Sequence, residues 1–199
     1  MNSSSFAPKA PPVHITDTSV FINLHACGQG ERILAAVPNE IIVARVVECE
    51  LDNETSRATG EHAFLERLVH SKIVTVVDFT DEEFELFDEL VRDLDDGEAA
   101  TIAIAAKRHF IPIIDERKGR ARAAMHVGKE PLWSLDLIRH SSVVNTIGGA
   151  AGIEALYLAL RIGRMRIPFD RVDEVIALIG EQRARECTCL PGYKARFGA

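Results

Sequence analysis

The chain has 199 residues, enough for one domain of ordinary size with some length left for tails or an added helical piece. Apolar residues make up 47 % and charged residues 27 %, a composition that excludes global disorder and is typical of a globular protein. The net charge of −7 disfavours a nucleic-acid ligand, because proteins that bind phosphate backbones usually carry a basic excess.

The N-terminal segment and the cysteines favour a cytoplasmic protein. Residues 1–12 lack the apolar segment of a signal peptide, and we interpret them as a flexible tail. No stretch approaches the roughly 18 to 20 apolar residues of a membrane span, so no membrane partner is expected. The cysteines, at positions 27, 49, 187 and 189, are too few and too unevenly spaced for a disulfide scaffold. We expect reduced thiols, with Cys187 and Cys189 as exposed residues rather than a structural zinc site.

The order of apolar runs and helix-period segments predicts the fold class. Strands are predicted at residues 13–16, 41–43, 72–79, 110–115 and 141–149. Helices are predicted at residues 18–28, 44–57, 60–70, 81–94, 98–109, 119–128, 131–140, 151–163 and 171–186. Strands that alternate with helices predict an α/β fold, with a mainly parallel sheet of about five strands covered by helices on both faces.

The same pattern divides the chain into regions. We place the principal domain at residues 13–165, with an insertion at residues 129–140 near the last predicted strand. Residues 166–199 are interpreted as a C-terminal helical extension and tail.

Two acids are predicted to meet at one edge of this sheet. Asp17 directly follows the first strand and Asp115 directly follows the fourth, and ligands of open parallel sheets bind beyond these carboxyl ends. If the two strands are neighbours, the two carboxylates emerge together, and like charges that close repel unless a cation lies between them. Each aspartate can also be explained as the N-cap of the helix that follows it.

Two glutamates on predicted helices are candidates to complete the site. Glu98 lies in the first turn of its helix and, with Ile102 four residues later, borders the apolar face. Asp95 and Glu98 also have capping-box spacing, which would explain both residues without a metal. Glu50 lies on the inward side of its helix, whereas its alternative Glu48 lies about 200° around the helix axis.

Four carboxylates without a matching set of histidines or cysteines favour a hard cation, Mg²⁺ or Mn²⁺, with Asp96 as a further candidate ligand. Such a cation suits phosphodiester hydrolysis, because it activates a bound water and stabilises charge on the phosphoryl oxygens. Bound cations would also offset the site carboxylates, which weakens the objection raised by the net charge.

Basic residues directly after Asp115 are candidates for contacts with an RNA backbone, although a solvated helix face explains them as well. They are Arg117, Lys118, Arg120 and Arg122. A second, weaker basic group consists of Arg161, Arg164 and Arg166.

Several segments resemble successive motifs of the PIN domain family, in the same order. They are ITDTSVFINL, VVECEL, LDDGEAATIAIAAKRHFIPIIDERKGRARAA and VVNTIGGAAGIEALYLALRIG. The resemblance implies an α/β/α sandwich and an Mg²⁺- or Mn²⁺-dependent ribonuclease. Many members of the family are toxins of bacterial toxin–antitoxin pairs, of the VapC type, so a cognate antitoxin protein is an implied partner.

The resemblance also assigns roles by residue. It places the family's acids on Asp17, Glu50, Glu98 and Asp115. Hydroxyl groups that would orient water or phosphate fall on Thr18 or Ser19 and on a strand-end Thr146. The sequence departs from the family at Asn145, where related sequences more often have glycine.

Rival functions fit the sequence less well. A haloacid-dehalogenase-like phosphatase requires an aspartate two residues after the first, where this chain has Ser19. A receiver domain requires a lysine at the end of a late strand, and residues 141–149 contain none. A non-catalytic PIN-like module that binds RNA or protein is the remaining alternative, and the presence of all four acids disfavours it. We expect a homodimer, the commonest symmetric assembly.

Overall fold

The computed structural model describes residues 11–198, so most of the expected flexible tail at residues 1–12 lies outside the described residues. The described chain contains one sheet of four parallel strands in the order β3-β2-β1-β4. The strands are β1 (His14–Thr16), β2 (Ile41–Ala44), β3 (Val74–Val77) and β4 (Ile111–Ile113). Strands β1, β3 and β4 lie within segments predicted as strands, and β2 extends its predicted segment by one residue.

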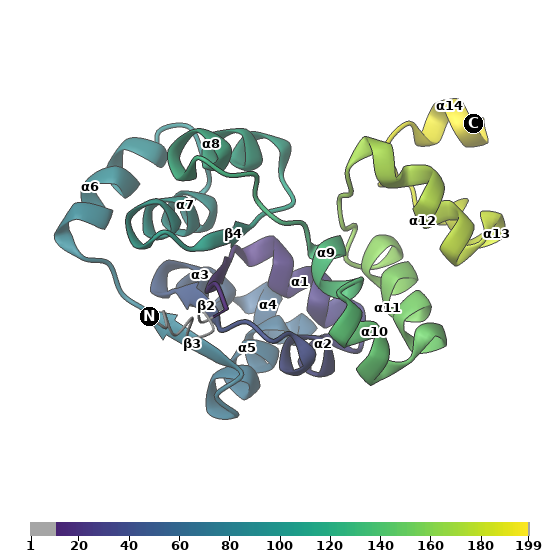
Figure 1. Cartoon of the computed structure of the whole chain (residues 1–199), viewed down its shortest axis with the longest axis horizontal. Coiled ribbons are helices and arrows are strands. Elements are labelled where there is room, and N and C mark those ends of the chain that lie inside the picture. Colours follow the sequence, from purple (N-terminus) through teal and green to yellow (C-terminus); the bar gives the residue numbers. More distant parts are fainter. Residues whose placement is uncertain (1–10, 199) are drawn as a thin grey trace, which may run out of the picture.

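Helices cover both faces of this sheet and extend beyond one side of it (Figure 1). Those of the N-terminal half are α1 (Thr18–Ala26), α2 (Gly30–Ala36), α3 (Arg45–Leu51), α4 (Glu54–Thr59) and α5 (Glu61–His70). The next are α6 (Asp81–Leu90), α7 (Asp96–Arg108), α8 (Arg117–Val127), α9 (Ser134–Ile138), α10 (Ser141–Ile147) and α11 (Gly149–Arg161). The last are the 3-10 helix η1 (Phe169–Arg171), α12 (Val172–Ile179), α13 (Glu181–Ala184) and α14 (Tyr193–Phe197).

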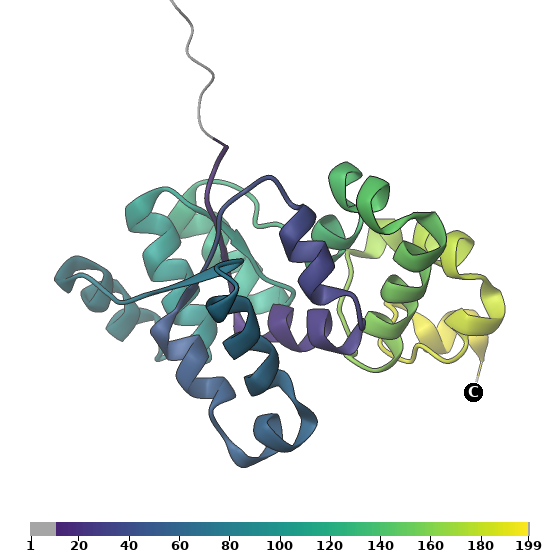
Figure 2. The ribbon, with the colours of Figure 1, turned by 90° about the horizontal axis from the view of Figure 1, so that it is seen from below.

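The helices and the sheet form the expected three-layer arrangement. Helix α7 packs on β1, β2 and β4 and carries α6 and α8 on its outer side, whereas α5 packs on β3 and against α1. The view in Figure 2 shows the C-terminal helices α11 to α14 gathered at one end of the molecule, away from α6. The structure is therefore an α/β fold with a parallel sheet, as the sequence predicted.

Helix α7 is buried along most of its length. Every residue from Gly97 to Ala105 is buried, because the helix lies between the sheet and the helices α6 and α8. Its many alanines suit this position, since small side chains allow neighbouring elements to approach closely. As a consequence, the first turn of α7, which includes Glu98, is fixed beside the carboxyl ends of β1 and β2.

The predicted fifth strand is wrong, because residues 141–147 form helix α10. Val143 and Ile147 are both buried and are spaced four residues apart, which places them on one side of a helix. At the start of the helix the Nδ1 atom of His140 accepts a hydrogen bond from the backbone N–H of Ser142 at 3.3 Å. The adjacent valines suggested a strand, but the four-residue spacing of the buried side chains decided the structure.

The outer edge of β4 is instead paired by the segment that we interpreted as an insertion. Leu132 forms an isolated parallel bridge with Ile113. Its backbone N–H donates to the carbonyl oxygen of Pro112 at 2.9 Å, and its carbonyl accepts from the N–H of Ile114 at 3.0 Å. This segment is thus an integral part of the sheet edge at which Asp115 emerges.

The C-terminal helices share the main hydrophobic core. Val172, Val175 and Leu190 are buried in the same cluster as Ile15 of the central strand. The predicted helix over residues 171–186 is divided into α12 and α13 at Gly180, which has a φ of 87°. Residues 166–198 therefore complete the core of the domain.

The expected exposure of the two C-terminal cysteines is wrong. The Cys187 side chain is fully buried, and its thiol donates a hydrogen bond to the carbonyl oxygen of Arg183 at 3.4 Å. Cys189 is half-buried and donates to the carbonyl oxygen of Leu160 at 3.1 Å. Burial raises the pKa of the Cys187 thiol to about 11, so the neutral thiol is favoured.

Within residues 11–198 no single helix is both long and apolar enough to cross a membrane. Helices α10 and α11 together meet the length and composition criteria, but they bend by 111° at their junction.

Candidate active site

Asp17 and Asp115 lie together at the carboxyl edge of the sheet. Strands β1 and β4 are parallel neighbours, with Thr16 opposite Ile113, so the residues that follow them emerge side by side. The backbone N–H of Asp17 donates to the carbonyl oxygen of Ile113 at 3.4 Å, which links the two strand ends. Both aspartates are only 2 % exposed.

Asp17 combines a capping role with a place in this acidic group. Its Oδ1 atom accepts hydrogen bonds from the backbone N–H of Val20 and from the hydroxyl of Ser19, both at 3.0 Å, so it is the N-cap of α1. Burial and the nearby charge of Asp115 nevertheless raise the pKa of Asp17 well above its usual value, with a smaller contribution from Glu98. The capping role that the sequence left open for Asp17 is therefore realised, and the same residue also lies beside Asp115.

Asp115 is held on both of its carboxylate oxygens. Oδ2 accepts from the Asn23 side-chain amide at 2.7 Å, and Oδ1 accepts from the backbone N–H of Ser134 at 2.8 Å. The N-cap of α8 is Glu116, so Asp115 does not cap that helix. Burial raises the pKa of Asp115 to about 6, even though the hydrogen bonds from Ser134 and Asn23 favour its charged form.

Glu98 is a buried acid with an unpaired oxygen. Its side chain is 8 % exposed, and its Oε1 atom has no hydrogen-bond partner among residues 11–198. The alternative capping box is absent, since Asp95 is the N-cap of α7 but makes no side-chain capping bond. Burial, followed by the charges of Glu116 and Asp95, raises the pKa of Glu98 to about 7. A buried polar atom without a partner is rare and calls for a functional explanation.

Glu50, and not its neighbour Glu48, faces the acidic group. One Glu50 oxygen accepts from the backbone N–H of Gly97 at 2.8 Å, and the other accepts from the Thr18 hydroxyl. Glu48 points elsewhere and forms an ion pair with Arg45 at 2.6 Å. These contacts tie α3 to the first turns of α1 and α7.

Two glycines make room for the glutamates. A Cβ atom on Gly97 would lie 2.4 Å from a Glu50 carboxylate oxygen, and one on Gly119 would lie 2.5 Å from the Glu98 Oε1 atom. Both distances are far inside van der Waals contact. A side chain at either position would therefore push the glutamate out of its present place.

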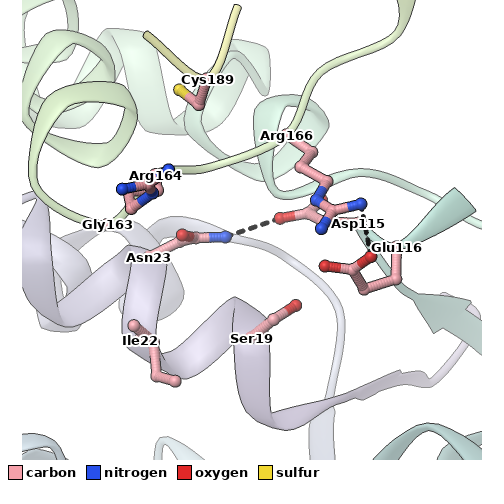
Figure 3. A pocket seen from close by; sticks show the side chains of 9 residues that line it. All are labelled: Ser19, Ile22, Asn23, Asp115, Glu116, Gly163, Arg164, Arg166 and Cys189. Carbon is pink, nitrogen blue, oxygen red and sulfur yellow. Dashed lines mark hydrogen bonds and ion pairs between the residues drawn. The ribbon is translucent and has the colours of Figure 1, made fainter. Parts of the chain in front are cut away.

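Two adjoining pockets open onto the acids. The first, of about 500 Å³, contains Asp17, Thr18, Glu50, Asp95, Asp96 and Glu98 in its lining. The second, of about 480 Å³, is lined by Ser19, Asn23, Asp115, Gly163, Arg164 and Arg166 among others (Figure 3). Ser19, Ile22 and Glu116 belong to both linings, so the pockets are adjacent parts of one depression.

Two residues of this depression were missed by the sequence reasoning. Asn23 is 3 % exposed and points toward Asp115 (Figure 3). The sequence could have pointed to Asn23, because it is a polar residue four positions after Ser19 and therefore on the same side of α1. Glu116 lies in both pockets and forms an ion pair with Arg166 at 2.6 Å. The sequence could have pointed to Glu116, because it is an acid directly after the strand-end Asp115.

The basic residues after Asp115 differ in their surroundings. The Arg120 guanidinium donates to the carbonyl oxygens of Ile114 and Leu132 at 2.8 Å and lies 3.7 Å from the ring centre of Trp133. It holds the segment that pairs with β4, so its proposed contact with RNA finds no support.

The other basic residues of α8 lie at its surface. Lys118 donates to the carbonyl oxygen of Asp93. Arg122 forms an ion pair with the Asp93 side chain, and Arg117 is exposed.

Thr146 does not occupy the expected strand end. It lies on helix α10, is exposed, and donates its hydroxyl to the carbonyl oxygen of Ser142 at 2.7 Å within the same helix. Neither pocket on the acids includes it in its lining. The structural reason for assigning it a role in the site is therefore lost.

The acidic group has the donor chemistry that a hard divalent cation requires. Among residues 11–198, no three acidic, histidine or cysteine side chains converge at metal-ligand distance in this conformation. The buried Asp17 and Asp115 nevertheless destabilise each other as anions, and Glu98 presents an unpaired oxygen. A cation would relieve the repulsion between the aspartates and provide a partner for Glu98, so these residues fit one.

Of the comparisons with known proteins, one identifies a family. No curated protein and no solved structure matches the chain. The sequence model of the PIN domain family matches residues 13–181, which is most of the chain. The match continues past residue 165, where we placed the end of the domain, and includes helix α12. The chain belongs to the PIN domain family.

Proposed function

We propose that this protein is an Mg²⁺- or Mn²⁺-dependent ribonuclease that hydrolyses RNA phosphodiester bonds. The observation that carries the proposal is the burial of Asp17 and Asp115 beside each other at the carboxyl edge of the sheet, with Glu98, a third buried acid, in the lining of the same depression. PIN domains are generally nucleases and typically use divalent metals, which supports the same reading.

The acids divide the chemistry between them. Asp17, Asp115 and Glu98 would hold the cation, with Glu50 as a fourth acid behind them. A divalent cation supplies an activated water and stabilises negative charge on the phosphoryl oxygens. A carboxylate beside the cation takes the proton of this water. The water oxygen then bonds to phosphorus, the bond to the leaving oxygen breaks, and that oxygen is protonated from solvent.

The surrounding hydrogen bonds position these acids. Asn23 and the backbone of Ser134 fix the Asp115 carboxylate on both oxygens. Thr18 and Gly97 fix Glu50 in the same way. Because both hydroxyl groups after the first acid, on Thr18 and Ser19, donate to carboxylates, we assign them a positioning role.

The test is cleavage of a panel of single-stranded and structured RNAs by the purified chain. We expect cleavage with Mg²⁺ or Mn²⁺, none with EDTA, and a loss of roughly 100-fold or more in Asp17→Asn. Asparagine is as good an N-cap as aspartate, so this variant keeps the start of α1. The matched control is Asp81→Asn, an exposed aspartate on α6, which should cleave like the wild type. Equal cleavage with EDTA or by Asp17→Asn would refute the proposal.

A toxin role is a narrower proposal that rests on the family resemblance. Expression of the wild type should then arrest bacterial growth, whereas Asp17→Asn should not, and a cognate antitoxin should reverse the arrest. Normal growth at high wild-type expression would exclude this role and leave the ribonuclease proposal intact. The homodimer and the cytoplasmic location stay predictions.

A further inference from the structure

A third pocket continues the depression beyond Asp115, on the side away from Asp17 and Glu98. It has a volume of about 550 Å³, and its lining includes Asp115, Arg117, Trp133, Arg166, Phe169 and Pro191. We call it the flanking pocket. It shares Asp115, Arg166 and Cys189 with the pocket of Figure 3, so a ligand that occupies both would pass directly over Asp115.

The flanking pocket presents an accessible aromatic ring. Phe169, the first residue of η1, is 70 % exposed even though it borders this pocket. Single exposed apolar residues are common on protein surfaces and mean little by themselves. Phe169 differs because Pro168 and Pro191 line the same pocket, which makes an apolar surface within reach of the acids.

Arginines surround this apolar surface. Arg117 and Arg166 line the flanking pocket itself, and Arg164 lines the pocket beside it. Arg166 reaches over Asp115 toward Glu116, with which it pairs (Figure 3). The Arg166 and Glu116 side chains are 57 % and 37 % exposed, so this ion pair is weak and a phosphate can replace the glutamate.

Arg164 is held in an unfavourable backbone conformation at the same rim. Its φ is 57°, in the left-handed region that side chains other than glycine rarely adopt. Arg164 lines the same pocket as Asn23 and Asp115 and adds a further positive charge to its rim (Figure 3).

We propose that the flanking pocket binds one nucleotide of single-stranded nucleic acid, with its base stacked on Phe169 and its phosphate neutralised by Arg117 and Arg166. That this nucleotide lies next to the cleaved bond rests on the ribonuclease proposal. The volume lies within the usual range for small-ligand pockets, roughly 300 to 1,000 Å³. An exposed ring beside cations suits a base and its phosphate, because an aromatic face stacks on any base and the cations bind the backbone.

The proposal predicts a preference for unpaired bases. In a duplex the bases are stacked on one another, so only a single strand can place a base on Phe169. An apolar segment of a partner protein could also fill the pocket, but it would offer no anion to Arg117 and Arg166. The charges around the pocket therefore favour a nucleic acid.

The test measures binding without cleavage. Fluorescence anisotropy of a labelled oligonucleotide of eight nucleotides is followed in the Asp17→Asn background, with single-stranded RNA, single-stranded DNA and an RNA duplex as separate probes. Phe169→Ala should weaken binding of single strands by roughly 5- to 100-fold, whereas Phe169→Trp should retain it. The matched control is Phe84→Ala, which removes a phenylalanine that is 54 % exposed on α6 and should leave binding unchanged.

The arginines are tested by salt dependence. Arg166→Gln and Arg117→Gln should each weaken single-strand binding and lower the slope of log Kd against log salt by about one. Lys107→Gln, a control at the other end of α7 from the acids, should leave the slope unchanged. If Arg166→Gln, Arg117→Gln and Lys107→Gln all give the same slope, the two arginines do not neutralise the phosphate of the bound nucleotide.

Each outcome distinguishes the two proposals. No binding of either single strand by the parent protein, or equal binding by Phe169→Ala and Phe84→Ala, overturns the nucleotide pocket. Unchanged oligonucleotide binding together with a partner protein that requires Phe169 would reassign the pocket to that partner. Binding that depends on Phe169 without any metal-dependent cleavage would refute the ribonuclease and retain the pocket. Comparison of RNA with DNA shows whether the sugar is recognised.

Discussion

At the scale of single residues, the site concentrates negative charge where water is excluded. Asp17, Glu98 and Asp115 are each at least nine-tenths buried, and burial is the largest cause of the raised pKa of all three. An arrangement of this kind lowers stability when no cation is bound, because each anion loses its hydration and approaches other anions. Residues that reduce stability in this way are characteristic of functional sites.

The cost of this charge gives a prediction for Asp17→Asn. The folded-state pKa of Asp17 is raised, so the folded protein retains a proton that the unfolded chain has lost, and wild-type stability falls as the pH rises above about 4. Asparagine does not titrate. In EDTA the variant should therefore have nearly the wild-type Tm at pH 4 and a Tm several degrees higher at pH 7.5. Thermal unfolding across this pH range measures the difference.

Two comparisons define this prediction further. Mg²⁺ at pH 7.5 should raise the Tm of the wild type more than that of Asp17→Asn, because a cation stabilises the state that it binds. Asp81→Asn, on the exposed surface of α6, should show no gain that grows with pH. A Tm for metal-free Asp17→Asn below that of the wild type at pH 7.5 would show that the charge of Asp17 does not destabilise the folded protein.

At the scale of elements, the site depends on close approach between helices and acids. Helix α8 passes Glu98 at Gly119, and helix α7 passes Glu50 at Gly97. In contrast, the capping box of α6 is purely structural. There Thr80 and Glu83 satisfy each other's backbone groups, and Glu83 pairs with Arg108 at 2.6 Å.

This close approach predicts that Gly119→Ala impairs the site more than the fold. The added methyl group would lie 2.5 Å from the Glu98 Oε1 atom, so the glutamate must move away from its present position. A displacement of about 1 Å in a catalytic group can cost up to about 100-fold, and we expect kcat/KM to fall by roughly 10- to 100-fold. The Tm should change little, because alanine is the better helix former and offsets part of the clash.

The matched control for Gly119→Ala is Gly152→Ala in helix α11. A Cβ atom there has only one neighbour within 4 Å, the Cδ1 atom of Ile147 at 3.9 Å. This variant should retain full activity and gain slightly in stability. Equal activity of the two variants would mean that the position of Glu98 does not matter for cleavage.

At the scale of the whole molecule, the C-terminal segment shares the main hydrophobic core with the rest of the chain. Its buried residues Val172, Val175 and Leu190 are part of the main core, and Arg166 and Phe169 border the depression at the acids. The same segment therefore contributes both to stability and to the proposed nucleotide pocket.

Truncation tests this role. Deletion of residues 166–199 should abolish cooperative thermal unfolding, because it exposes the core side that α12 and the buried Leu190 cover. Deletion of residues 193–199 should lower the Tm only slightly, since helix α14 has no buried residue. Circular dichroism during heating measures both. If the chain that lacks residues 166–199 unfolds cooperatively near the wild-type Tm, a domain boundary at residue 165 is supported.

The sequence by itself determined the class of fold and the identity of the two strand-end acids. Regular alternation of strand and helix patterns requires crossovers, and crossovers produce parallel strands whose carboxyl ends share an edge. Asp17 and Asp115 could be placed at that edge because each directly follows an apolar run. Helical period favoured Glu50 over Glu48, and the family resemblance also placed an acid on Glu50.

Only the tertiary structure decided the surroundings of these acids. Residues 141–147 contain a strand-like pair of valines, but packing of Val143 and Ile147 on one side selects a helix. The supports of Asp115 come from Asn23 and from Ser134, which are 92 and 19 residues away in the chain. A local sequence pattern shows only the spacing of apolar residues and the intrinsic preference for helix or strand. Contacts between distant segments produce the burial of the acids, the unpaired Glu98 oxygen and the pocket beside Phe169. Their physical cause is the packing of the whole chain.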